Sequence, residues 1–201
     1  MRFSALSVLV VALATQTQAV MDIYMTISDS NNKNVGTATP GNTIVPNGIQ
    51  LDTYSFGSVQ TVNFTSPSST TSERLSAGKL AFNTFTLTKA ADVNSPVILN
   101  RMAVGFSHTI NVYFYRVVAG NGFSTQRQYM ELQFREAGFT AQSFSSGGTE
   151  GQQTETLSFH YGAMQISYTP TKTNGTSGAP VTSGWSVIHN GPEVDMVPRL
   201  A

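Results

Sequence analysis

Apolar and polar residues alternate along this chain from Met21 onward. In the stretch MDIYMTI, Ile23, Met25 and Ile27 are separated by Tyr24 and a threonine. A period of two is the pattern of a β-strand that buries one face. The same alternation, between clusters of Gly, Ser and Asn, predicts further strands at residues 61–64, 80–88, 108–118, 128–139, 154–161, 164–169 and 184–189.

The segment TETLSFHYG shows the alternation most clearly. Leu157, Phe159 and Tyr161 share one face of the expected strand, and polar residues share the other. Burying one face and exposing the other to water is typical of antiparallel sheets. The β-branched and aromatic residues of these segments favour strands as well. We therefore predict an all-β fold, an antiparallel β-barrel or sandwich.

One segment departs from this period and predicts a short flanking α-helix at about residues 96–104. In NSPVILNRMAVG, Ser95 is the expected N-cap, Pro96 the first helical residue and Gly105 the C-terminal cap. Its apolar residues predict a wide apolar face; they are Val97, Ile98, Leu99, Met102 and Ala103.

The first residues of the chain have a different character. Residues 1–19, MRFSALSVLVVALATQTQA, contain a basic Arg2, an apolar run and small residues at Thr17 and Ala19. This layout predicts a secretory signal peptide that is cleaved between Ala19 and Val20. The apolar run is shorter than the ~20 residues that span a bilayer, so no stable membrane insertion is expected. The mature protein is predicted to be secreted.

The remainder divides into one β domain over residues 20–190 and a tail over residues 191–201. The two prolines of the tail predict an extended end. Two stretches rich in Gly, Pro, Ser or Thr, residues 28–48 and 65–78, are expected to be long loops, which are often functional.

The composition excludes some kinds of function and leaves the predicted fold unchanged. Charged residues make up 11% of the chain, against about 25% in an average soluble protein, and the formal net charge is zero. Such a chain offers no electrostatic attraction for nucleic acid. The absence of cysteine excludes disulfides and thiolate metal sites.

No pattern of catalytic residues emerges from the sequence. The histidines, His108, His160 and His189, do not have metal-ligand spacing, and the carboxylates form no recognisable motif. We expect no enzymatic activity, no metal and no cofactor. Two sequons, at Asn63 and Asn174, are possible N-glycosylation sites if the exported protein meets a glycosylating compartment.

Three stretches together resemble the Hcp (haemolysin-coregulated protein) family of type VI secretion tube proteins. They are GKLAFNTFTLTKAADVNSPVILNRMAVG, SFSSGGTEGQQTETLSFHYGAMQISYTP and GAPVTSGWSVIHN. The first carries a Thr-Lys strand end followed by Asp92, Ser95 and Leu99, and the third carries Trp185. The resemblance covers roughly residues 21–190.

This resemblance implies a compact β-barrel with a flanking helix. It also implies homo-oligomeric rings, with six copies per ring, that stack into tubes and act as a non-catalytic conduit or carrier for a protein cargo. Trp185, the only tryptophan, is expected to be a structural anchor in the core.

Two alternatives remain open at this point. One is a secreted, monomeric β-sandwich that binds carbohydrate or a cell surface; a row of surface aromatics beside Asp or Asn would favour it. The other is a secreted hydrolase, which would require clustered titratable groups in a cleft.

Overall fold

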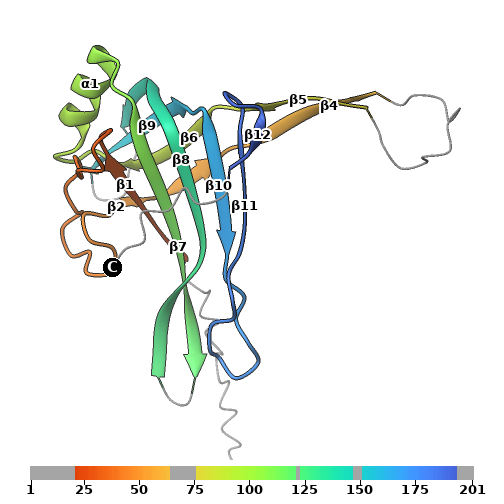
Figure 1. The fold of residues 1–201 in the computed structure, drawn as a ribbon. Helices are drawn as coiled ribbons and strands as arrows, with labels where there is room; N and C mark the ends of the chain where they lie inside the picture. The colour runs from red at the N-terminus through yellow and green to blue at the C-terminus, as the bar shows by residue number, and fades with distance from the viewer. Residues whose placement is uncertain (1–20, 64–75, 121–122, 147–150, 194–201) are drawn as a thin grey trace, which may run out of the picture.

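The computed structural model describes residues 21–63, 76–120, 123–146 and 151–193 (Figure 1). It contains a single helix, α1 (Ser95–Val104), in this part of the chain. The strands are β1 (Met21–Ser28), β2 (Ile49–Leu51), β3 (Thr53–Ser55), β4 (Ser58–Asn63), β5 (Ser76–Phe82), β6 (Phe85–Ala90), β7 (His108–Gly120), β8 (Phe123–Ser146), β9 (Gln153–His160), β10 (Ala163–Tyr168), β11 (Val181–Ser186) and β12 (Gly191–Pro192).

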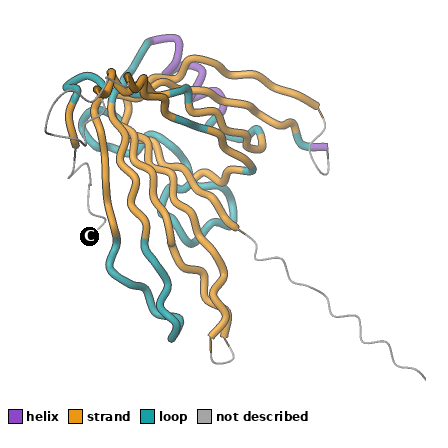
Figure 2. Tube along the Cα trace, turned by 90° about the vertical axis from the view of Figure 1, so that its right-hand side faces the viewer, coloured by secondary structure: helices purple, strands orange, loops and turns teal. Residues whose placement is uncertain are grey.

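Ten of these strands pair antiparallel in one strongly bent sheet, and β4 and β5 form a separate two-stranded sheet. The main path of the large sheet runs β12-β11-β10-β8-β7-β1-β2, and a branch runs β8-β9-β6-β3. The long strands lie side by side in Figure 2, with the helix at the end of the sheet away from where β7 ends and β8 begins. The predicted all-β fold with one short helix is confirmed.

Strand β8 joins the two parts of the sheet. Its residues up to Ala137 pair with β7 and β10, whereas Gly138 and the residues after it pair with β9. Glu136, at this change of partner, has a φ of 52°, in the left-handed region. On the far side the chain passes from β2 to β3 through Asp52, whose N–H donates to the Thr88 carbonyl over 2.9 Å. The two parts therefore enclose a common core.

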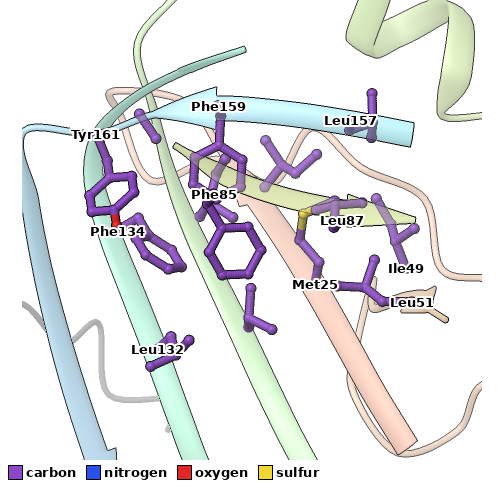
Figure 3. Packing of buried hydrophobic residues seen from close by; sticks show 14 of the residues in the cluster. Met25, Ile49, Leu51, Phe85, Leu87, Leu132, Phe134, Leu157, Phe159 and Tyr161 are labelled. Carbon is purple, nitrogen blue, oxygen red and sulfur yellow. The ribbon is translucent and has the colours of Figure 1, made fainter. Parts of the chain in front are cut away.

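A group of aromatic rings packs together among the aliphatic side chains of that core (Figure 3). Phe85 lies directly opposite Phe159 in the β6–β9 register, with ring centroids 4.9 Å apart. Phe134 of β8 packs edge-on against Phe85, also at 4.9 Å. These three side chains are fully buried. Each of the three occupies an inward-facing position of its strand, so the alternation of apolar and polar residues places all three rings in the core.

Several predicted strand boundaries are wrong, because the place of each segment in the folded chain sets where the strand begins and ends. The expected strand 80–88 is two strands, because β5 ends at Phe82 and β6 begins at Phe85. Between them the Asn83 N–H donates to the Gly57 carbonyl, and the chain passes from a projecting hairpin into the barrel. The expected strand 184–189 is Val181–Ser186, and residues 187–190 form a turn.

The helix is nearly where it was predicted, but its start and its burial differ. Asn94 and not Ser95 is the N-cap residue, while Gly105 caps the C-terminus with a φ of 76°, as predicted. The predicted wide apolar face is not buried. Ile98 is the one apolar side chain of the helix that is fully covered, and Leu99 is 53% exposed.

Two further expectations need correction. Trp185 is only partly buried on β11, outside the core cluster, and its buried indole N–H has no hydrogen-bond partner. The tail predicted from residue 191 begins with a strand, because Gly191 and Pro192 pair with Ser186 and Trp185. Within the described ranges no helix has the length and apolar character to cross a membrane.

Candidate assembly surfaces

A buried ion pair lies where β6 and β9 meet the helix. Lys89 and Glu155 are neighbours in the strand register, and Lys89 Nζ lies 2.7 Å from Glu155 Oε2. Both side chains are fully buried. Lys89 Nζ also lies 2.7 Å from Asp92 Oδ1. Removing ions from water is costly, so such a group is stable only when it is fully paired.

The first turn of α1 completes this network. The Ser95 hydroxyl donates to Glu155 Oε2 over 2.5 Å, and the amide of Gln142 donates to Glu155 Oε1 over 2.5 Å and to the Ser95 carbonyl over 2.9 Å. Ser95 is therefore not a cap but an anchor of the helix to the barrel. Lys89, Asp92, Ser95 and Glu155 all belong to the motifs on which the family resemblance was based.

The same place contains a lysine close to a serine hydroxyl, because Lys89 Nζ lies 3.4 Å from Ser95 Oγ. A lysine that activates a serine must be able to accept its proton. Here the Lys89 ammonium is held between two carboxylates, and Ser95 is only 7% exposed. The arrangement therefore serves to position the helix.

Helix α1 in turn holds the long segment between β1 and β2, residues 29–48. Asn94 Nδ2 donates to the Thr37 carbonyl over 3.0 Å, and Asn94 Oδ1 accepts from the Thr37 N–H over 2.7 Å. This two-way bond fixes the segment against the body of the domain. Residues 28–48 were expected to be a loop, but Ser28 still belongs to β1, where it pairs with Thr109. Residues 29–48 contain no strand pairing apart from a single bridge between Asn34 and Ser28.

Strand β11 has an edge of which the described residues cover only the second half. It pairs with β10 along its length. On its other side β12 pairs with Trp185 and Ser186, and the Glu193 N–H donates to the Gly184 carbonyl over 3.1 Å. Val181, Thr182 and Ser183 are exposed, and Val181 is 71% exposed. None of these residues is charged, although charges are the usual protection of an edge strand against pairing with another chain.

A hairpin arm, β4 and β5, projects from the body (Figure 1). Its two strands pair with each other and with no other strand of the described chain. Val59 and Val62 on this arm are 58% and 39% exposed. An isolated two-stranded hairpin is marginally stable in water, so the arm would gain stability by packing against a neighbour.

Tyrosines gather on the outer face of β1 and β7, opposite the core. Tyr24 and Tyr113 are paired in register and nearly buried, and Tyr115 packs edge-on against Tyr24 with ring centroids 6.0 Å apart. Burial, and then the Glu131 carboxylate, raise the pKa of Tyr113. Burial likewise raises the pKa of Glu131.

The sequence-predicted site residues are scattered. Ala19 and Val20 lie outside the described residues, so the cleavage site stays a prediction. Asn63 ends β4, and Asn174 is exposed in the loop before β11, where its Oδ1 accepts from the Thr176 N–H and hydroxyl. Glycosylation of either stays a prediction. Among the described side chains, no three His, Asp or Glu residues come close enough to hold a metal ion.

His108 is the buried histidine, and burial lowers its pKa below that of an exposed imidazole. The unfolded chain, with a histidine pKa of about 6.5, then binds more protons than the folded chain as the pH falls through that value. The folded protein therefore keeps its full stability above about pH 6.5, where His108 is neutral in both states. It loses stability as the pH falls from there toward the lower pKa that His108 has in the folded chain.

We expect the melting temperature to fall between about pH 7.5 and 5.5, and to fall less in a His108→Gln variant. The exposed His160 supplies the control, because His160→Gln should keep the wild-type dependence. Equal pH profiles for wild type and His108→Gln would contradict the assignment.

Comparison with known proteins decides which family shares this architecture. A family model described as the type VI secretion system effector Hcp matches residues 24–168, which contain most of the barrel, the arm and the helix. The chain belongs to the Hcp family. No curated protein matches it.

Solved structures of Hcp proteins show the same fold. A structure described as a type six secretion system protein superposes with a TM-score of 0.65 at 19% identity, covering 87% of this chain and all of that one. Hcp1 from Salmonella typhimurium gives 0.61 at 14% identity, with 86% and 99% coverage. Secreted protein Hcp3 from Pseudomonas aeruginosa gives 0.53 at 15%, with 83% and 98%.

The family places limits on function. Hcp proteins are secreted, structural proteins of the type VI secretion system and not enzymes. This chain is therefore a type VI tube or effector-type protein at that level of description.

Proposed function

We propose that this Hcp protein forms closed homo-oligomeric rings, most simply hexamers, that act as a non-catalytic conduit or carrier for a protein cargo. In this proposal the leader of residues 1–19 exports the chain, and the rings form after export. The observation that carries the proposal is the uncharged first half of the β11 edge, Val181–Ser183, which no described strand covers.

The edge supports ring formation for a physical reason. The backbone N–H and C=O groups of Val181–Ser183 on the free side have no strand partner in the described chain, and a strand of a second copy can pair with them. Repeated contacts of this head-to-tail kind close into a ring when the rotation between copies permits it. The projecting β4–β5 arm supplies a second surface that reaches beyond its own subunit.

The test is the mass of the purified mature chain, measured by light scattering over a concentration series. We expect a mass of several chains that stays constant as the protein is diluted into the micromolar range. Val181→Lys should shift the mass toward one chain, because it places a charge on the edge. Val93→Lys, at a position 64% exposed just before α1, is the matched control and should leave the mass unchanged.

Two results of this experiment would contradict the proposal or part of it. A wild-type mass of one chain at the highest attainable concentration would defeat the ring. A ring that survives Val181→Lys would leave the proposed oligomer standing but assign its contacts to a different surface, of which the β4–β5 arm is the first to test.

A further inference from the structure

The outer face of the main sheet, opposite the core, buries polar side chains. Asn111, Gln133 and Gln165 lie directly opposite one another on β7, β8 and β10, so they form a row across this face. Their exposed fractions are only 7%, 2% and 3%. Asparagine and glutamine are mostly exposed in proteins, so a face that buries three of them lies beneath another part of the chain.

The described elements account for only part of this cover. The segment of residues 29–48 packs against the tyrosines of β1 and β7, at one end of the row. The turn of residues 187–190 is bonded to Gly162, before the start of β10. Strand β10 itself makes extensive contacts only with its sheet neighbours, β8 and β11, among the described elements. The cover of Gln133 and Gln165 therefore comes from outside these elements.

The chain leaves β12 directly onto this face. Gly184 lies opposite Gln165 in the β10–β11 register, so a Cβ on Gly184 would stand on the same face as the row of amides. That Cβ would overlap the Glu193 carbonyl oxygen, which therefore lies over the face and not along the β11 edge. The Glu193 carboxylate points the same way, because its Oε1 lies 3.8 Å from Nη1 of Arg135 on β8.

The residues after Glu193 are long enough to cross the face. Residues 194–201, VDMVPRLA, lie outside the described residues. As an extended chain they span roughly 26 Å, at ~3.3 Å per residue. The sheet path from β11 through β10, β8 and β7 to β1 is shorter, about 19 Å at ~4.8 Å per strand. Most of these residues are apolar, which is unusual for an end that remains in water.

Charge complementarity supports the same path. Glu131 shares the outer face with Gln133, because the two are two residues apart on β8. Glu131 is partly buried, and no Lys or Arg of the described chain lies within ion-pair distance of it. Arg199 is the one cation of residues 194–201. A chain that crosses from β11 toward β1 brings this cation close to the Glu131 carboxylate.

We propose that residues 194–201 dock on the outer face of the main sheet and cross it over Gln165 and Gln133 toward β7. The contact is made within one chain, so the inference does not depend on ring formation. It bears on assembly all the same. Because the chain turns onto the face at Gly184, it leaves Val181–Ser183 open to a strand of another copy.

Disulfide formation tests the contact, because the chain has no cysteine of its own. Three or four residues beyond Glu193 the extended chain has advanced about 10–13 Å, which places it over β8. Gln133→Cys is therefore combined with Met196→Cys or with Val197→Cys in the full mature chain, under mild oxidation. We expect an intramolecular disulfide in at least one pair, seen in the intact mass of a single chain.

The control combines Met196→Cys with Phe144→Cys, which is exposed on the part of β8 that pairs with β9, and it should form no intramolecular disulfide. A non-reducing gel separates disulfides between chains from those within one chain, so ring formation and tail docking are scored independently. Absence of an intramolecular disulfide in both Gln133→Cys pairs would overturn the proposal.

Thiol labelling shows whether the tail is what covers the face. We expect a water-soluble maleimide to label Gln165→Cys at least about tenfold more slowly than Asn100→Cys, which is exposed on α1. Adding Met196→Asp and Val197→Asp should release the tail and raise the rate at position 165 about tenfold, without changing the rate at position 100. Gln133→Cys replaces Gln165→Cys if the latter does not fold. A rate that the two tail substitutions leave unchanged would show that another segment covers the face, and would overturn the proposal.

Discussion

Replacing Lys89 by methionine is expected to destabilise the domain by about 3–5 kcal/mol. The substitution leaves the Glu155 carboxylate, which is fully buried, without its cation. Methionine has nearly the length of lysine, so the loss reflects the uncompensated charge more than lost packing. The free energy of unfolding is measured by urea titration at neutral pH, followed through the fluorescence of the single tryptophan.

Two controls separate charge from packing. Lys172→Met, at an exposed position in the loop before β11, should change stability by no more than about 0.5 kcal/mol. Adding Glu155→Gln to Lys89→Met removes the orphaned charge and should recover part of the loss. A Lys89→Met protein as stable as the Lys172→Met control would show that water reaches the network and that the helix is not anchored by it.

Replacing Phe85 by alanine is expected to cost about 3–5 kcal/mol as well, for a different reason. Phe85 is fully buried and touches the rings of Phe134 and Phe159, so its removal opens a cavity between β6, β8 and β9. The barrel walls cannot collapse into that space without breaking strand pairing. Loss of the aromatic pairs adds to the loss of buried area.

The matched control is Phe144→Ala, because Phe144 is 52% exposed on β8. We expect its effect on the urea midpoint to be small, within about 0.5 kcal/mol. Phe85→Leu should lie between the two, since leucine refills part of the cavity. Equal midpoints for Phe85→Ala and Phe144→Ala would contradict the packing described for the core.

The two kinds of stabilisation act on different parts of the domain. The aromatic cluster holds the two parts of the sheet together, whereas the Lys89–Glu155 network fixes α1, and through Asn94 the segment of residues 29–48. We therefore expect partial loss of the network to loosen α1 and the segment of residues 29–48 more than the aromatic cluster.

The fold class could be predicted because it depends on local pattern. A side chain on a strand faces one of two sides, so alternation at Ile23, Met25 and Ile27 or at Leu157 and Phe159 is sufficient to predict which residues face the core. The end of the helix at Gly105 was equally local, because a left-handed residue without a Cβ is the usual way to stop a helix.

Only the tertiary structure decided what each polar residue contacts. Ser95 had the sequence position of an N-cap, but its hydroxyl donates a hydrogen bond to Glu155 instead. A local sequence pattern cannot predict a contact with a residue that is distant in the chain. Strand pairing likewise places Lys89 beside Glu155, and the return of the 29–48 segment places Thr37 beside Asn94.

Trp185 shows that the burial of an apolar residue is equally hard to predict from local pattern. Its alternation and its size favoured the core, yet β11 lies near the end of the sheet path, where few elements remain to cover a large ring. The alternation determines which face of a strand a residue occupies. The depth at which that residue is buried depends on how many strands lie to either side, and only the closed sheet specifies this.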